Sequence, residues 1–170
     1  VYRTREIEAG DDATVVQYQR PASGCLSYMI VSGEAAMVVD PLRAFTERYV
    51  DDAAERGAEI TTVVDTHVHA DHVSGLRTLA GETGGRAVMP RLSVERGVQY
   101  EVDTVVDGEQ LTVGDATVGV VHLPGHTTGM TGFAVGRVLL SGDSLFVESV
   151  ARPDLEQGTG GATALAAQLH

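Results

Sequence analysis

Short apolar runs, separated by glycine or acidic turns, make up most of the chain, and amphipathic stretches interrupt them. The runs are rich in β-branched residues, so they predict short strands. The expected strands are residues 13–18, 25–31, 34–40, 60–65, 86–89, 110–113, 116–122, 132–135 and 138–140, with one more near Val105. The second half of the chain is therefore expected to be mostly β-structure.

Residues 45–56 have the spacing of an amphipathic helix, which places Phe45, Tyr49 and Ala53 on one face. Gly57 supplies a natural C-terminal stop for it. A shorter helix is expected near residues 75–82, and alanine and leucine at helical spacing predict another at residues 162–169. Strand, helix, strand, helix and then many strands predict layered α and β structure with two sheets, in the α/β (α+β) class.

The length of 170 residues predicts one domain, residues 1–170. The chain begins at Val1 rather than Met and ends at His170 inside the last helical pattern, with no stop signal after it. We therefore expect a segment of a longer protein, or a trimmed chain, whose C-terminal part is truncated.

The formal net charge of −12 makes nucleic acid and anionic membranes poor partners, because both require a positive surface. No apolar run is long enough to span a bilayer, and the first ten residues do not resemble a signal peptide. Cys25 is the single cysteine of the chain, so no internal disulfide can form. These features favour a reducing cytoplasm.

The most informative segment follows the expected strand at residues 60–65. His67, His69, Asp71 and His72 stand within six residues there, in the order HVHADH. An extended backbone projects His67 and His69 to the same side, and a turn at Ala70 can bring the next two side chains close. Imidazole nitrogen and carboxylate oxygen are ligands that suit Zn²⁺ and Fe²⁺.

Two further candidate ligands follow later strands. His126 stands in a PGHTTG segment, and Asp143 stands in LLSGD, just past a β run. Loops at strand ends are where a sheet scaffold usually carries its site. A lone histidine is most often a surface or structural residue, and we expect this of His122. The six candidate ligands together, each in a loop after an expected strand, are far less likely to occur by chance than a single histidine.

The HxHxDH motif at residues 67–72, the PGHT segment at 124–127 and the GD pair at 142–143 resemble the metallo-β-lactamase superfamily. Residues 38–41, VVDP, also resemble its early strand. The resemblance runs from about Cys25 to Leu155. It implies an αβ/βα sandwich with a metal site at one edge between the two sheets.

Two branches of that superfamily share these motifs. Residues 23–28 (SGCLSY) and 151–155 (ARPDL) resemble persulfide dioxygenases and their rhodanese-fused relatives. That branch implies one Fe²⁺ held by His67, His126 and Asp143, and oxidation of glutathione persulfide to sulfite. A rhodanese-like domain outside this segment would be a natural partner. His69, Asp71 and His72 would then orient ligands or metal-bound water, with Asp71 the candidate catalytic residue.

The alternative branch is the glyoxalase II type, a Zn²⁺-dependent hydroxyacylglutathione hydrolase. There all six residues, His67, His69, Asp71, His72, His126 and Asp143, would bind two metals. One more downstream histidine normally completes the second position, and here only His170 follows Asp143, on an expected helix. This favours one metal, and a truncated chain is the alternative explanation for the missing histidine. A third alternative is a non-catalytic metal-binding module of a sulfur-transfer protein.

Two residues remain open in their interpretation. Arg152 could hold a substrate carboxylate through its guanidinium fork, and an ion pair with a nearby acid such as Asp154 is an equal alternative. Cys25 is placed on an expected buried strand, where it would pack as a small apolar residue. The sequence leaves the oligomeric state open.

Overall fold

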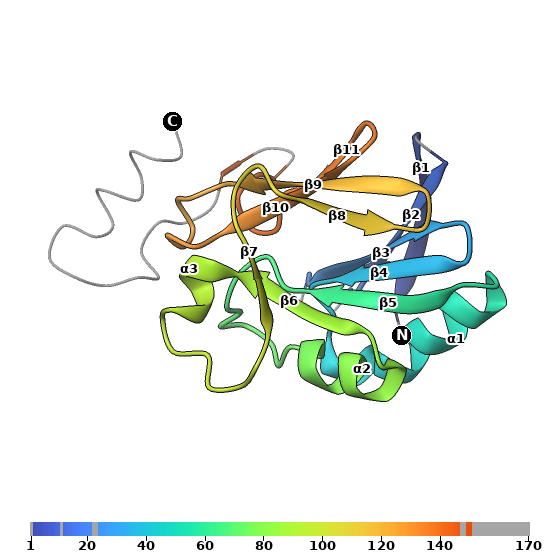
Figure 1. Ribbon diagram of the computed structural model, residues 1–170, viewed down its shortest axis with the longest axis horizontal. Coiled ribbons are helices and arrows are strands. Elements are labelled where there is room, and N and C mark those ends of the chain that lie inside the picture. The colour runs from blue at the N-terminus through green and yellow to red at the C-terminus, as the bar shows by residue number, and fades with distance from the viewer. Residues whose placement is uncertain (1, 11, 22–23, 147–148, 151–170) are drawn as a thin grey trace, which may run out of the picture.

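The computed structural model describes residues 2–10, 12–21, 24–146 and 149–150, and shows two sheets packed face to face with helices beside the larger one (Figure 1). The expected layered α and β fold is confirmed. None of the helices in these ranges is long and apolar enough to cross a membrane. The expected helix at residues 162–169 lies outside the described residues.

The larger sheet contains seven strands in sequence order, β1 to β7. Strands β1 to β4 pair antiparallel, whereas β4 to β7 pair parallel. Their bounds are Arg3–Gly10 (β1), Ala13–Gln19 (β2), Leu26–Ser32 (β3), Ala35–Val39 (β4), Glu59–Val64 (β5), Arg86–Pro90 (β6) and Asp103–Val105 (β7).

The second sheet has four antiparallel strands in the order β11-β10-β9-β8. These strands are Gln110–Val113 (β8), Ala116–His122 (β9), Thr131–Val135 (β10) and Val138–Leu140 (β11). The expected ranges for β8, β9 and β11 match these bounds. Loops from this sheet carry two of the candidate ligands.

Helices α1 and α2 connect the parallel strands, as parallel pairing requires. A 3₁₀ helix at Arg43–Phe45 leads into α1 (Thr46–Glu55), α2 spans Leu76–Thr83, and a single turn, α3, spans Arg91–Val94. The buried hydroxyl of Tyr49 on α1 lies 2.6 Å from Oγ of Ser27 and accepts a hydrogen bond from the amide of Leu42. The helix is thereby tied to β3 and to the end of the β4 loop.

The core has two apolar layers, and β4 contributes to both. Met37 and Val39 point between the sheets, while Ala36 and Val38 point towards the helices. A strand buried on both faces must be apolar throughout, which is why this segment lacks alternation. The residues that follow β4 and β5 are therefore anchored to the buried centre of the larger sheet.

Two elements were not expected, and several boundaries differ from expectation by one residue. Strand β1 is not among the expected strands, because its charged side chains lie exposed at the sheet edge and give no apolar signal. Helix α3, of four residues, is too short to show a period. The strand expected from residue 25 begins at Leu26, so Cys25 is wrongly placed on it and instead lies half-buried in the preceding loop.

Candidate metal centre

The ends of β4 and β5 carry the foundation of the site. Val39 pairs with Val64 in the parallel register, so Asp40 and Asp65 lie at the same edge, and the amide of Asp40 donates to the carbonyl of Val64. Asp40 has a positive φ of 52°, a conformation that aspartate tolerates better than most residues. Its carboxylate points into the loop that carries the histidines.

Thr66 links this foundation to the first histidine. Its amide donates to Oδ1 of Asp40 at 2.7 Å, and its hydroxyl donates to Oδ2 at 2.9 Å. The hydroxyl proton is thus committed, so Oγ1 can only accept from Nδ1 of His67, which lies 2.9 Å away. This fixes the tautomer of His67 and leaves its Nε2 lone pair available.

His67, His126 and Asp143 form the first group of donors. Oδ2 of Asp143 lies 4.0 Å from Nε2 of His67 and 3.5 Å from Nε2 of His126. One ligand atom from each residue lies within 4.8 Å of the others. Ligands about 2.0–2.2 Å from an ion stand about 3–3.4 Å apart, so a small contraction would enclose Fe²⁺ or Zn²⁺. The donor set therefore fits the metals that the motifs predict.

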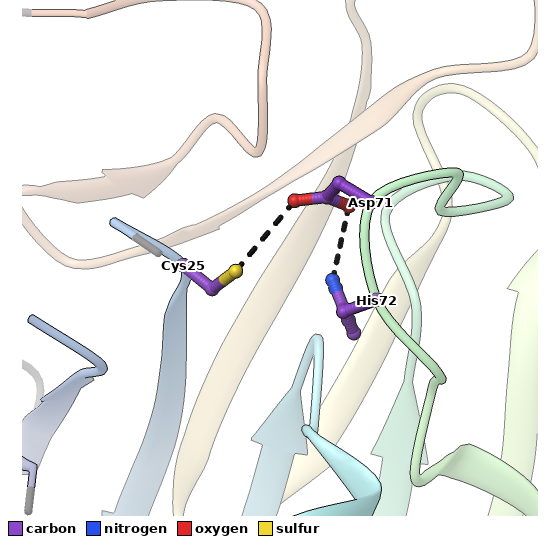
Figure 2. A group of neighbouring side chains, drawn as sticks. All are labelled: Cys25, Asp71 and His72. Atoms are coloured by element: carbon purple, nitrogen blue, oxygen red, sulfur yellow. Dashed lines mark hydrogen bonds and ion pairs between the residues drawn. The ribbon is translucent and has the colours of Figure 1, made fainter. Parts of the chain in front are cut away.

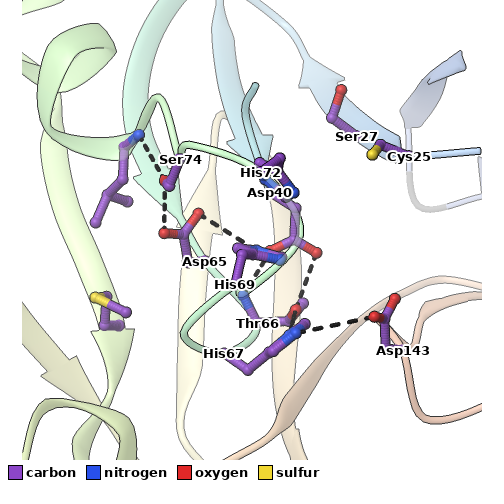
Figure 3. Close-up of polar contacts among 12 residues, drawn as sticks. Cys25, Ser27, Asp40, Asp65, Thr66, His67, His69, His72, Ser74 and Asp143 are labelled. Carbon is purple, nitrogen blue, oxygen red and sulfur yellow. Dashed lines mark hydrogen bonds and ion pairs between the residues drawn. The ribbon is translucent and has the colours of Figure 1, made fainter. Parts of the chain in front are cut away.

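His69 belongs to a different group. Its Nε2 lies 3.0 Å from Oδ1 of Asp40 and 3.9 Å from Oδ1 of Asp65, and Asp65 also accepts from Oγ of Ser74 at 2.7 Å (Figure 3). Its ring lies between those of His67 and His72, with centroids 4.2 Å from each. In this arrangement Nε2 of His69 is engaged by carboxylates.

Asp71 and His72 form a third group, together with Cys25. Nδ1 of His72 lies 3.1 Å from Oδ1 of Asp71, and Sγ of Cys25 lies 3.6 Å from Oδ2 of the same carboxylate. The six candidate residues are therefore neighbours, but the structure distributes them over three adjacent donor groups.

Burial and charge separate the protonation states of these groups. Burial lowers the pKa of His67 to about 3 and raises the pKa of Asp65 to about 7. Burial alone would lower the pKa of His69, but the carboxylates of Asp40 and Asp65 outweigh it and raise that pKa to about 9. Burial also raises the pKa of Asp143. Neutral His67 can act as a ligand without first losing a proton.

A cavity of about 430 Å³ opens beside the three groups. Tyr28 lines one part of it and Leu145 and Phe146 another, both of the latter half exposed. Asp71, His72 and Asp143 also line it. The cavity thus combines apolar walls with the polar groups of the candidate centre.

The remaining sequence candidates have different outcomes. The expectation for His122 is confirmed, because its Nε2 lies 2.8 Å from the carbonyl of Thr128 in a structural hydrogen bond. Arg152 and His170 lie outside the described residues. Sequence reasoning missed the supporting roles of Asp40 and Thr66. A signal existed, because Val-Val-Asp occurs at residues 38–40 and again at 63–65, which marks two paired strand ends.

Two sheets with three clustered donor groups at one edge define a metal-binding αβ fold of the lactamase type. The family model of the metallo-beta-lactamase superfamily matches residues 20–169, so the chain belongs to that superfamily.

Two enzyme names recur among the curated relatives of the chain. The chain is 30% identical over 149 residues to the human mitochondrial persulfide dioxygenase ETHE1, covering 84% of this chain and 56% of that protein. It is 33% identical over 132 residues to a hydroxyacylglutathione hydrolase of Maricaulis maris, covering 75% of this chain and 48% of that protein. The chain thus spans about half the length of these relatives.

Solved structures agree with the fold. A metallo-beta-lactamase from Staphylococcus aureus superposes with a TM-score of 0.84 at 28% identity, covering 93% of this chain and 51% of that one. ETHE1 from Myxococcus xanthus superposes with a TM-score of 0.71 at 23% identity, covering 99% and 67%. The expected αβ/βα metallo-β-lactamase sandwich is confirmed, and the chain is related to metalloenzymes of this fold.

Proposed function

We propose that the chain carries a persulfide dioxygenase activity, with one Fe²⁺ held by His67, His126 and Asp143. The observation that carries the proposal is the clustering of two histidines and one carboxylate, while Nε2 of His69 is bonded to Asp40. Two imidazoles and one carboxylate are the ligand set of many non-haem iron oxygenases. Iron bound there would supply the open positions at which O₂ and a persulfide sulfur meet.

The proposed substrate is a low-molecular-weight thiol persulfide of the glutathione persulfide type. The balanced reaction converts R–S–SH, O₂ and water into R–SH, sulfite and two protons. The apolar side chains of Leu145 and Phe146, which line the cavity together with Tyr28, suit the thiol carrier. We also propose that Arg152 binds a substrate carboxylate, and that the protein acts in the reducing cytoplasm beside a rhodanese-like domain.

Asp71 is the proposed catalytic residue at the cavity wall. Burial acts to raise its pKa, but His72 outweighs this and lowers it, so the carboxylate is ionised at neutral pH. Its side chain is 59% exposed and can therefore meet a polar atom of the substrate. In this role Asp71 orients the substrate and accepts a proton from water.

The second candidate is zinc-dependent hydrolysis of S-lactoylglutathione. The observation that favours it is the third donor group, which places Asp71 and His72 beside the first. A third possibility is a metal-binding module without turnover. The name of the Maricaulis maris relative agrees with the second candidate, as that of human ETHE1 does with the first.

One experiment separates these candidates. The protein is purified anaerobically and loaded with Fe²⁺ or Zn²⁺, and each form is given glutathione persulfide or S-lactoylglutathione. We expect O₂ uptake and equimolar sulfite from the iron form, and at least a hundredfold loss in Asp143→Ala. Thioester cleavage by the zinc form without O₂ uptake by the iron form would establish the hydrolase instead. Bound metal with neither activity would support the module.

A further inference from the structure

A second recess, of about 460 Å³, opens beside the cavity of the candidate centre. Two arginines, Arg20 and Arg43, line it together with Leu42, Ala44 and Val73. Arg20 follows β2, Arg43 lies between β4 and α1, and Val73 lies in the loop after β5. The fold therefore brings two guanidinium groups from separate segments to one recess.

Backbone hydrogen bonds fix the position of both arginines. The amide of Arg20 donates to the carbonyl of Cys25 at 3.0 Å, and the carbonyl of Arg20 accepts from the amide of Gly24 at 2.9 Å. The amide of Arg43 donates to the carbonyl of Val73 at 3.1 Å. Because the backbone is already held, a ligand has to order only the two side chains, which limits the entropic cost of binding.

The recess adjoins the cavity through neighbouring residues. Cys25 and His72 line the cavity, where both contact Asp71 (Figure 2). Val73, the residue after His72, lines the recess, and Arg20 is bonded to the backbone of Cys25. Consecutive Cα atoms are about 3.8 Å apart, both in this wall and between the cysteine and glycine of a small peptide. A peptide thiol whose sulfur lies in the cavity therefore has to extend by only about one residue to reach the recess.

The recess also lies in an acid-free part of an acidic chain. All of its lining residues come from three segments: residues 13–33, 41–46 and 72–81. None of these segments contains Asp or Glu, although the chain has 24 acidic residues and a net charge of −12. Neither Arg20 nor Arg43 forms an ion pair with a carboxylate of the described residues. Two guanidinium groups without a protein counter-charge suit an anionic ligand, and their planar donors match a carboxylate.

We propose that Arg20 and Arg43 form a subsite for the carboxylate of the thiol carrier, an inference that rests on the proposed function in taking a small peptide thiol as the ligand. In glutathione the glutamyl carboxylate stands beside its own ammonium group. The glycyl carboxylate has no such counter-charge and follows the cysteine directly, so it is the group assigned to the recess. Leu42 and Val73 give the recess apolar sides, which lower the local dielectric and strengthen the ion pairs. Glutathione has two carboxylates, so the subsite is compatible with the role proposed for Arg152.

The test measures binding and needs no turnover. Calorimetry on the iron-loaded protein gives the dissociation constants of S-methylglutathione and of the ethyl ester of its glycyl carboxylate. We expect S-methylglutathione to bind at least tenfold more tightly than the ester, and this advantage to shrink at high salt. Arg20→Gln and Arg43→Gln should each reduce the advantage at least threefold, and the double variant should abolish it. Arg86→Gln is the matched control and should keep it, because it removes the same charge at the start of β6, where Arg86 pairs with Asp103.

The comparison of the two ligands in the unaltered protein depends on no variant. Absence of binding there, or equal affinity for S-methylglutathione and its ester, would overturn the subsite. A tenfold advantage that survives in the double variant would also overturn it, because the carboxylate would then be held elsewhere. Carboxylate-dependent binding without persulfide oxidation would reject the proposed function and leave the subsite standing.

Discussion

Thr66 offers the sharpest test of how the centre is organised. It is fully buried, and its hydroxyl stands 2.9 Å from both Asp40 and His67. Thr66→Val keeps the branched shape and removes the hydroxyl. Oδ2 of Asp40 would lose one donor, and Nδ1–H of His67 would lose its acceptor, with no water-exposed alternative for either.

The expected cost follows from the two hydrogen bonds. A bond to a charged group contributes about 1.5–3 kcal/mol, and a buried partner left unsatisfied costs about 1–3 kcal/mol. Asp40 retains the amide of Thr66 and Nε2 of His69 on Oδ1, which limits the loss on that side. We therefore expect the free energy of unfolding of the metal-free protein to fall by about 2–4 kcal/mol.

Metal affinity should fall as well, because His67 would no longer be held in the tautomer that presents Nε2. Loss of such a supporting hydrogen bond typically weakens binding about 10- to 100-fold. Urea unfolding gives the stability change, and competition with a chelating dye gives the affinity. Thr66→Ser retains the hydroxyl and is the matched control. If Thr66→Val and Thr66→Ser bind metal equally well, the proposed orientation of His67 by Thr66 is wrong.

Three further predictions concern stability. Gly142→Ala should lower the free energy of unfolding in urea by about 2–4 kcal/mol, because the residue has φ +51° and the added methyl would stand 2.6 Å from Oγ1 of Thr66. Gly84→Ala is the control and should cost less, because Gly84 has φ +72° but open space around it. Tyr49→Phe should lower the free energy of unfolding by about 1–3 kcal/mol, since it leaves the Ser27 hydroxyl and the Leu42 amide without this hydrogen-bond partner. A change under about 0.5 kcal/mol would contradict this. In the metal-free protein the pKa of His69 is raised, so protonated His69 stabilises the fold. This contribution to stability is complete below about pH 6.5 and is lost towards pH 9. The free energy of unfolding should be lower at pH 9 than at pH 7, by at most about 3 kcal/mol from this source. His69→Gln should reduce that difference.

The strands were predictable wherever burial imposes a pattern. Strand β9 lies between two neighbours and alternates, so both of its ends follow from the sequence. Strand β1 has mostly exposed side chains and is held by hairpin pairing with β2, so its own residues show no apolar alternation that would predict a strand. Helix α1 begins at Thr46 because a 3₁₀ turn uses the preceding residues, and periodicity alone cannot separate the two.

The candidate centre was predictable in its residue types but not in its grouping. The motif identifies which side chains can bind a metal, whereas their assignment depends on which carboxylate each histidine meets. His69 and Asp71 are two positions apart, yet the first faces Asp40 and the second faces Cys25. The strand expected to include Cys25 starts one residue later, which releases the thiol towards the cavity. A single backbone position thus changes the residue from a packing group into part of the cavity wall.

Asp40 connects these observations, because one carboxylate orients two histidines with different results. Through Thr66 it leaves His67 with a free Nε2, and directly it engages Nε2 of His69. Its position follows from the parallel register of β4 and β5, each of which ends in Val-Val and is followed by aspartate. The register of two apolar strands therefore determines which histidine nitrogens are available before any metal binds. Any change that shifts this register should disturb both histidines together, even where every ligand of the motif is retained.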